Sequence, residues 1–150
     1  MLAVRLLPEH GFLRDKHGAF TTIDAPGATG STEVLDINPS GVIIGDNRSN
    51  FTGFIRYPNG SFTTIDTGSL ACGGGSLPYG INPAGAVTGA TSDPTCSFEL
   101  GYLRTPDGTV TTFNTPGVGY ITPQAINLAG AITGNYSDAN GFQHGFLRLP

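Results

Sequence analysis

Apolar and β-branched residues occur along the chain in short runs separated by turn-forming residues. Gly and Pro are so frequent, at 23 and 11 of 150 residues, that no stretch free of both exceeds the eight residues Ser31 to Asn38. An ordinary helix needs about ten residues and tolerates neither residue in its interior, so it has no place to form. The pattern predicts an all-β fold of short strands and turns.

Three short sequence elements recur along the chain. Gly-Phe-Leu-Arg, or a close variant, occurs at Gly11–Arg14, Gly53–Arg56, Gly101–Arg104 and Gly145–Arg148. The other two recur at Phe20–Asp24, Phe62–Asp66 and Val110–Asn114, and at Ile37–Gly41, Ile81–Gly85 and Ile126–Gly130. Asn38 and Asn82 are 44 residues apart, and Asn82 and Asn127 are 45 apart. This period falls within the range of about 40 to 45 residues for four-stranded β-propeller blades.

The repeats divide the chain into a non-repeating segment, 1–9, and one repeat domain, 10–150. Its units span approximately 10–27, 28–68, 69–117 and 118–150. In each unit strand a ends at Ile-Asn, strand b follows the next Gly, strand c is Gly-Phe-Leu-Arg, and strand d is Phe-Thr-Thr-Ile-Asp. The predicted order is therefore c-d, a-b-c-d, a-b-c-d and a-b-c.

The turns between strands c and d predict the strand register. Asn59-Gly60 and Asp107-Gly108 are typical of two-residue type I′ turns, and His17-Gly18 takes the same place in the first unit. The pairs that follow are Arg56 with Thr63, Phe54 with Ile65, Arg104 with Thr111, Tyr102 with Phe113, and Arg14 with Thr21.

Three blades per chain are too few to close a ring, because propellers contain about four to eight. Two copies related by a two-fold axis would supply six blades, with the N-terminal hairpin of each copy completing the last blade of the other. A six-bladed homodimer is the favoured prediction. A trimer and a fragment of a longer propeller are the alternatives.

Charge and hydropathy limit the partners. A formal net charge of -4 with only seven Lys and Arg leaves too few cations to neutralise a nucleic-acid backbone or to hold an anionic membrane surface. The longest apolar run is much shorter than the roughly 20 residues of a membrane span. Met1 to Leu7 is interrupted by Arg5, so we expect no signal peptide in this chain.

Cys72 and Cys96 lie in two loops of the third unit that are predicted to emerge on the same face. Both loops are longer than their counterparts in the other units. A disulfide between Cys72 and Cys96 would link the two longer loops covalently, and two free thiols are the alternative. Two cysteines without a nearby His leave a zinc site incomplete.

The repeat resembles the HAF family of extracellular bacterial repeats. The likeness rests on Ile-Asn-x-x-Gly, on the Gly-Phe-Leu-Arg element, and most closely on His10–Leu13, Phe20–Gly27 and His144–Leu147. The resemblance implies a propeller-type repeat protein that is secreted or surface-associated, with an extracellular or periplasmic location. It supplies no catalytic residues, and a fold alone does not name a function.

The residues that recur in every unit have structural explanations. Phe12, Phe54, Tyr102 and Phe146 are predicted to pack between blades. The arginines that follow them are predicted to make hydrogen bonds at the blade edge. Asp46–Ser49 and Asp138–Gly141 offer oxygen ligands for calcium, although these residue types also form ordinary turns.

The leading functional prediction is a non-catalytic module that binds or scaffolds, with no certain cofactor and a small molecule or glycan as ligand. The predicted site is the channel mouth near the starts of strands a. Its residues are Glu33, Asp36, Tyr79, Tyr120 and Gln124.

The alternative is a metal-assisted hydrolase of esters or phosphoesters. His10 and His144 occupy equivalent positions and would approach each other at the seam between two chains. With Asp138 or Glu9 nearby, they could hold zinc or a similar divalent ion. Each histidine is also explained as a repeat residue that caps strand c.

Overall fold

The computed structural model describes residues 8–68, 75–115 and 120–150, and in these ranges the chain forms thirteen β-strands and no helix. Consequently, no described helix is long and apolar enough to cross a membrane. The strands are β1 (Gly11–Arg14), β2 (Phe20–Ile23), β3 (Thr32–Ile37), β4 (Ile43–Asn47), β5 (Thr52–Arg56), β6 (Phe62–Thr64), β7 (Ser76–Ile81), β8 (Val87–Ser92), β9 (Glu99–Arg104), β10 (Val110–Phe113), β11 (Ile121–Ile126), β12 (Ile132–Ser137) and β13 (Gln143–Arg148).

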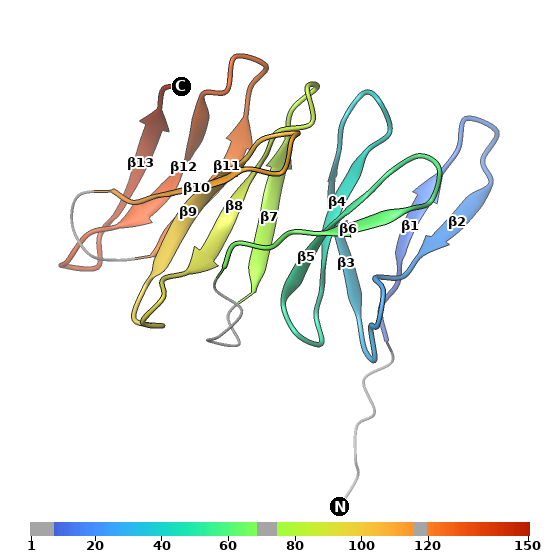
Figure 1. The fold of residues 1–150 in the computed structure, drawn as a ribbon, viewed down its shortest axis with the longest axis horizontal. Helices are drawn as coiled ribbons and strands as arrows, with labels where there is room; N and C mark the ends of the chain where they lie inside the picture. Colours follow the sequence, from blue (N-terminus) through green and yellow to red (C-terminus); the bar gives the residue numbers. More distant parts are fainter. Residues whose placement is uncertain (1–7, 69–74, 116–119) are drawn as a thin grey trace, which may run out of the picture.

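The strands form separate antiparallel sheets arranged in a row (Figure 1). Their orders are β1-β2, β3-β4-β5-β6, β7-β8-β9-β10 and β11-β12-β13. The strand order predicted from the repeats is confirmed. The all-β fold class is confirmed as well.

The predicted register of the c-d hairpins is wrong by one residue. Tyr57 N donates to Ser61 O at 2.9 Å, Gly60 N donates to Tyr57 O at 2.9 Å, and Gly60 has a φ of 87°. The loop therefore has three residues, Pro58, Asn59 and Gly60, in a type I turn whose last residue is the left-handed Gly60, rather than the two residues of a type I′ turn. The observed pairs are Arg56 with Phe62, Phe54 with Thr64, Arg104 with Val110, Tyr102 with Thr112, and Arg14 with Phe20.

The corrected register changes which side chains share a face of the sheet. A slip of one residue moves every side chain of a strand to the opposite face. Phe62 consequently packs edge-to-face on Phe54, with ring centroids 5.4 Å apart. Ile65 lies with Ile55 on the other face, where both are buried.

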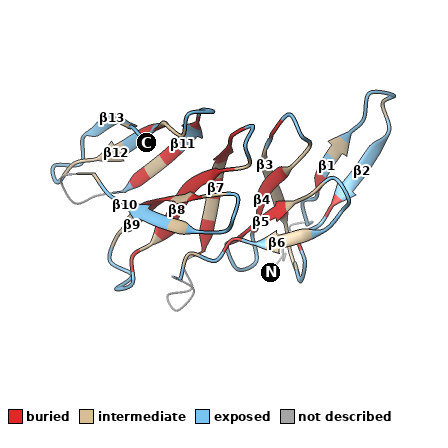
Figure 2. Ribbon diagram, turned by 45° about the horizontal axis from the view of Figure 1, so that its top comes forward, coloured by how far each residue is buried: buried red, intermediate tan, exposed pale blue. Residues whose placement is uncertain are grey.

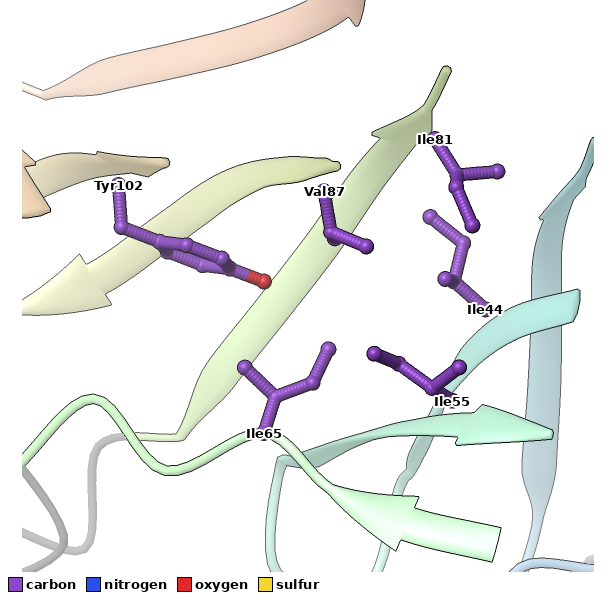
Figure 3. Close-up of a cluster of buried hydrophobic side chains, with 6 residues drawn as sticks. All are labelled: Ile44, Ile55, Ile65, Ile81, Val87 and Tyr102. Carbon is purple, nitrogen blue, oxygen red and sulfur yellow. The ribbon is translucent and has the colours of Figure 1, made fainter. Parts of the chain in front are cut away.

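The largest described core cluster lies between the two four-stranded sheets. Ile44, Ile55 and Ile65 from one sheet meet Ile81, Val87 and Tyr102 from the next (Figure 3). Full burial of one such side chain is worth about 1.5 to 3 kcal/mol. Buried residues are concentrated in β4 and β8, whereas β2 and β13 at the ends of the row are largely exposed (Figure 2).

Three of the four aromatic residues predicted to pack between blades do so: Phe54, Tyr102 and Phe146, the last against Phe113 of the preceding sheet. Phe54 and Tyr102 are buried, but Phe12 on β1 is exposed. Phe12 belongs to the first sheet of the row, and no earlier sheet of the described chain is present to cover it.

The asparagine of the Ile-Asn-x-x-Gly element joins neighbouring sheets. Asn38 Nδ2 donates to Asn82 O at 3.2 Å, and Asn82 Nδ2 donates to Asn127 O at 3.0 Å. The Oδ1 atoms of Asn38 and Asn82 accept from Val42 N and Ala86 N within their own turns. Each of these two asparagines therefore closes its own turn and ties its sheet to the next one.

The predicted disulfide falls partly outside the described residues. Cys96 lies in the loop between β8 and β9, whereas Cys72 is outside the described ranges. No described cysteine is free. The Cys72–Cys96 pairing stays a prediction.

Candidate functional site

The residues predicted to line the channel mouth lie on the first strands of three successive sheets. Glu33 and Asp36 are on β3, Tyr79 is on β7, Gln124 is on β11, and Tyr120 immediately precedes β11. Strand β7 contacts both β3 and β11. The structure thus places four of the five residues on neighbouring strands and Tyr120 directly before one of them, but their surroundings differ.

Each first strand contains a β-bulge at the same position. The register shifts between Val34 and Asp36, between Pro78 and Gly80, and between Pro123 and Ala125. Tyr79 and Gln124 are the extra residues of two of these bulges. A bulge changes the direction of a side chain, and here Tyr79 is half-buried while Gln124 is exposed.

Both carboxylate oxygens of Asp36 accept hydrogen bonds from backbone N–H groups, so its position is explained without a ligand. Its Oδ2 accepts from Ile81 N on β7 at 3.0 Å, and its Oδ1 accepts from Ile37 N at 2.8 Å. The first of these bonds crosses from one sheet to the next. Asp36 therefore helps to fix β3 against β7.

Glu33 belongs to a charged cluster that also includes Asp46 and Arg48. Nη2 of Arg48 contacts Oε2 of Glu33, and its Nε lies 3.4 Å from Oδ1 of Asp46. The side chain of Asp46 is 1% exposed, and its Oδ1 has no hydrogen-bond partner among the described residues. Burial raises the pKa of Asp46 to about 6. The guanidinium of Arg48 is thus held between two carboxylates, one of them deeply buried.

Tyr79 and Glu99 extend this cluster. Burial raises the pKa of Tyr79, the carboxylates of Glu99 and Asp46 raise it further, and the guanidinium of Arg48 lowers it. Burial also raises the pKa of Glu99. Tyr79 therefore lies within electrostatic range of these charges. We call Glu33, Asp46, Arg48, Tyr79 and Glu99 the Arg48 cluster.

The charged members of the Arg48 cluster depart from the repeat. Leu77 and Ala90 in the next sheet are paired as Glu33 and Asp46 are, and Ser92 corresponds to Arg48. In the last sheet the corresponding residues are Thr122, Asn135 and Ser137. If Glu33, Asp46 and Arg48 served to stabilise the repeated scaffold, every sheet would need them. Because they occur in one sheet, scaffold stability does not explain them.

Sequence reasoning included Glu33 and Tyr79 in a site but missed Arg48, and it considered Asp46 only as part of a calcium loop. It aligned the units to find the residues they share. A search for positions at which a single unit carries a charged residue would have found the cluster.

His10 immediately precedes β1 and His144 lies on β13, and these two strands belong to the sheets at opposite ends of the row (Figure 1). His10 Nδ1 is 2.5 Å from Asp24 Oδ1, and His144 Nε2 is 3.1 Å from Asp138 Oδ2. The ring of His144 also stacks on Tyr136, with centroids 5.2 Å apart. One chain does not bring His10 and His144 together, and its described residues contain no group of three or more metal-ligating side chains. Their approach at a seam stays a prediction.

Asp138 acts in the turn between β12 and β13. Its Oδ1 accepts from Asn140 N at 2.8 Å and from Phe142 N at 2.9 Å. The hydrogen bond with His144, followed by the one from Phe142 N, lowers the pKa of Asp138. These bonds explain the Asp138–Gly141 loop as an Asx-type turn without calcium.

Comparison with known proteins shows the fold. No protein-family model and no curated protein matches the chain. A streptogramin B lyase structure matches with a TM-score of 0.54 and 18% identity, over 95% of this chain and 48% of that one. A catalytically inactive variant of virginiamycin B lyase from Staphylococcus aureus, determined with quinupristin, matches with a TM-score of 0.52 and 17% identity, over 94% and 49%. These lyases are β-propellers, so the chain has a propeller-type fold. It spans about half the length of the structures it matches.

Proposed function

We propose that this chain is a binding module of a β-propeller protein and takes a small polyhydroxylated ligand, of the glycan class, at the Arg48 cluster. The observation that carries the proposal is the position of Arg48 between Glu33 and Asp46 in one sheet only. Residues that differ from those at the equivalent positions of the other units are not needed to maintain the repeated scaffold.

The chemistry of the cluster fits a ligand rich in hydroxyl groups. A guanidinium fixed by two carboxylates loses little freedom when its remaining N–H groups donate to ligand oxygens. Glu33 can accept from ligand hydroxyls, and half-buried Tyr79 adds an aromatic surface beside them. A few convergent polar groups next to an aromatic ring are typical of small-molecule sites.

Energetics support the same interpretation. Asp46 is buried, and its Oδ1 has an ion-pair contact with Arg48 Nε but no hydrogen-bond partner among the described residues, so its charged form costs stability. Groups that cost stability are often retained for function. One of the similar propellers was determined with the small molecule quinupristin, which is a supporting analogy.

The test is a thermal-shift screen of the 150-residue chain against mono- and oligosaccharides, followed by calorimetry on any hit. We expect at least one saccharide to raise the melting temperature, and Arg48→Ala to abolish that shift. The matched control is Lys16→Ala, which removes one positive charge from an exposed turn. A saccharide that stabilises Arg48→Ala as much as the control would refute the site. No binding by any saccharide would refute the ligand class.

The alternative, a metal-assisted hydrolase, requires His10 and His144 from two chains. Its support is that each histidine already has a carboxylate neighbour. Metal analysis of the purified protein separates the two functions, because only the hydrolase predicts a stoichiometric divalent ion and loss of esterase activity in His10→Ala. An extracellular or periplasmic location is proposed from the HAF resemblance and from the predicted Cys72–Cys96 disulfide.

A further inference from the structure

Among the residues that the structure describes, the last sheet of the row has three strands, whereas the two preceding sheets have four. In the described part of the chain, β3–β6 and β7–β10 contain four strands, whereas β11-β12-β13 ends at β13. A hollow of about 450 Å³ lies beside β13, and its lining includes Phe113, Tyr136, Phe146, Leu147 and Arg148. The outer edge of β13 is therefore open for pairing.

The complete sheet β3–β6 shows what belongs at this edge. There β6 pairs with β5, and Phe62 packs on Phe54. Phe146 corresponds to Phe54 in the repeat. It already contacts Phe113 of the previous sheet, with centroids 6.2 Å apart, but no fourth strand supplies a counterpart of Phe62.

Strand β2 carries the sequence that fits. It has the Phe-Thr-Thr-Ile pattern of a fourth strand, and its Phe20 is 65% exposed. Its present partner is β1, and the five residues His10–Arg14 are identical to His144–Arg148. The register is therefore defined: Thr22 would pair with Phe146, and Phe20 with Arg148, as they now pair with Phe12 and Arg14.

Strands β2 and β13 lie at opposite ends of the same chain (Figure 1). We propose that β2 of one copy becomes the fourth strand of the β11-β12-β13 sheet of a second copy, and the reverse at the other end, closing a two-chain ring. Since β1 and β13 would hold the same place in the shared sheet, one of the two identical five-residue segments is released at each seam.

The opposite end of the row supports this arrangement. Ile37 on β3 is 49% exposed, whereas the equivalent Ile81 is buried against the sheet before it. A hollow of about 560 Å³ next to β1 and β3 is lined by His10, Phe12 and Val34 among others. The partner's β11 and β12 are the first and second strands that the β1-β2 sheet lacks, and they would cover this region.

The asparagine hydrogen bonds give independent support. Asn38 and Asn82 each donate through Nδ2 to the next sheet, but Asn127 has no such acceptor among the described residues. In the closed ring, the carbonyl of the partner's Asn38 would stand where the next acceptor is expected. Both ends of the row therefore expose apolar side chains, and the hydrogen-bonding pattern of the asparagines continues from one end to the other.

The test is the mass of the purified chain in solution by light scattering over a concentration series. We expect twice the 15.5 kDa chain mass, and a Phe20→Asp variant with at least a tenfold weaker dimer. The control is Phe142→Asp, which changes an equally exposed phenylalanine outside the proposed contact. Circular dichroism checks that both variants fold. A monomer at all concentrations, or a dimer unaffected by Phe20→Asp, would overturn the proposal.

A mixing experiment tests the direction of the contact. Leu147→Asp changes the receiving side of the seam, and we expect it to weaken the dimer as Phe20→Asp does. A mixture of the two variants retains one unaltered seam, formed by β2 of the Leu147→Asp copy and β13 of the Phe20→Asp copy. We expect the mixture to associate more strongly than either variant alone. Equal weakness in the mixture would show that these faces do not meet each other. Because no ligand is present, failure here leaves the proposed saccharide site untouched.

Discussion

The interior of the row and its open end present the same repeat positions in opposite surroundings. Ile55 and Leu147 are equivalent residues of Gly-Phe-Leu-Arg, yet Ile55 is 2% exposed and Leu147 is 62% exposed. Asn82 and Asn127 differ in the same way, since among the described residues Asn82 donates its side-chain amide to a following sheet and Asn127 does not. The repeat thus specifies a strand and its register, whereas the neighbouring sheet determines what each side chain contributes to stability.

The largest expected difference concerns Ile55 and Leu147. Ile55→Ala leaves a cavity in the core shared by two sheets, and we expect it to lower the free energy of unfolding by about 2 to 5 kcal/mol. Leu147→Ala, measured in the Phe20→Asp background to exclude dimer contacts, should change it by about 0.5 kcal/mol or less. Urea denaturation provides both values. Equal losses would mean that Leu147 is covered within one chain.

The second prediction compares Asp46 with Asn135, its exposed counterpart in the last sheet. Because the folded-state pKa of Asp46 is raised from 3.8 to about 6, the folded protein holds a proton that the unfolded chain releases. Stability should therefore fall as pH rises through this window. Asp46→Asn should remove that fall and raise the free energy of unfolding at pH 7 by about 1 to 2 kcal/mol. Asn135→Asp should leave the slope between pH 4 and 6 unchanged.

Denaturation curves of wild type and both variants at pH 4, 5, 6 and 7 measure these slopes. If Asp46→Asn were less stable than wild type at pH 7, the contact with Arg48 would outweigh the cost of burying the carboxylate.

The smallest expected difference concerns the asparagines. Asn82→Ala removes the bond to Asn127 and leaves Ala86 N without its side-chain acceptor, so we expect a loss of about 1 to 2 kcal/mol. Asn127→Ala removes only the acceptor within its own turn and should cost about half as much. Thermal melting at low protein concentration compares them. A larger loss for Asn127 would indicate that its amide has found an acceptor at a seam.

The strand order could be predicted because the repeat occurs in three copies that can be aligned. A strand assignment that is ambiguous in one copy is resolved by the other two. In the second and third hairpins the register was predicted wrongly because Pro58 and Pro106 were not taken into account; the first hairpin forms the same loop with Lys16 at this position. Proline fixes φ near −65° and favours the second position of a type I turn, so Asn59 and Asp107 take the third position and the following Gly adopts the left-handed region. That one additional loop residue accounts for the shift.

The candidate site was predictable only in part. Glu33 and Tyr79 were expected near the starts of the first strands; Glu33 lies there on β3, whereas Tyr79 lies further along β7, at its bulge. The link to Arg48 depends on pairing between β3 and β4 together with packing against β7, and neither follows from a linear pattern. Alignment for shared residues also conceals positions where one unit differs.

The bonds made by Asn38 and Asn82 run in one direction, since each sheet donates to its successor and accepts from its predecessor. The row therefore has a direction, and its two ends are not equivalent. A whole unit of about 44 residues could be inserted or deleted and the asparagine hydrogen bond would still form at each remaining joint. Propellers of different circumference could then arise from this repeat by duplication, with the curvature at each joint deciding which ring sizes close.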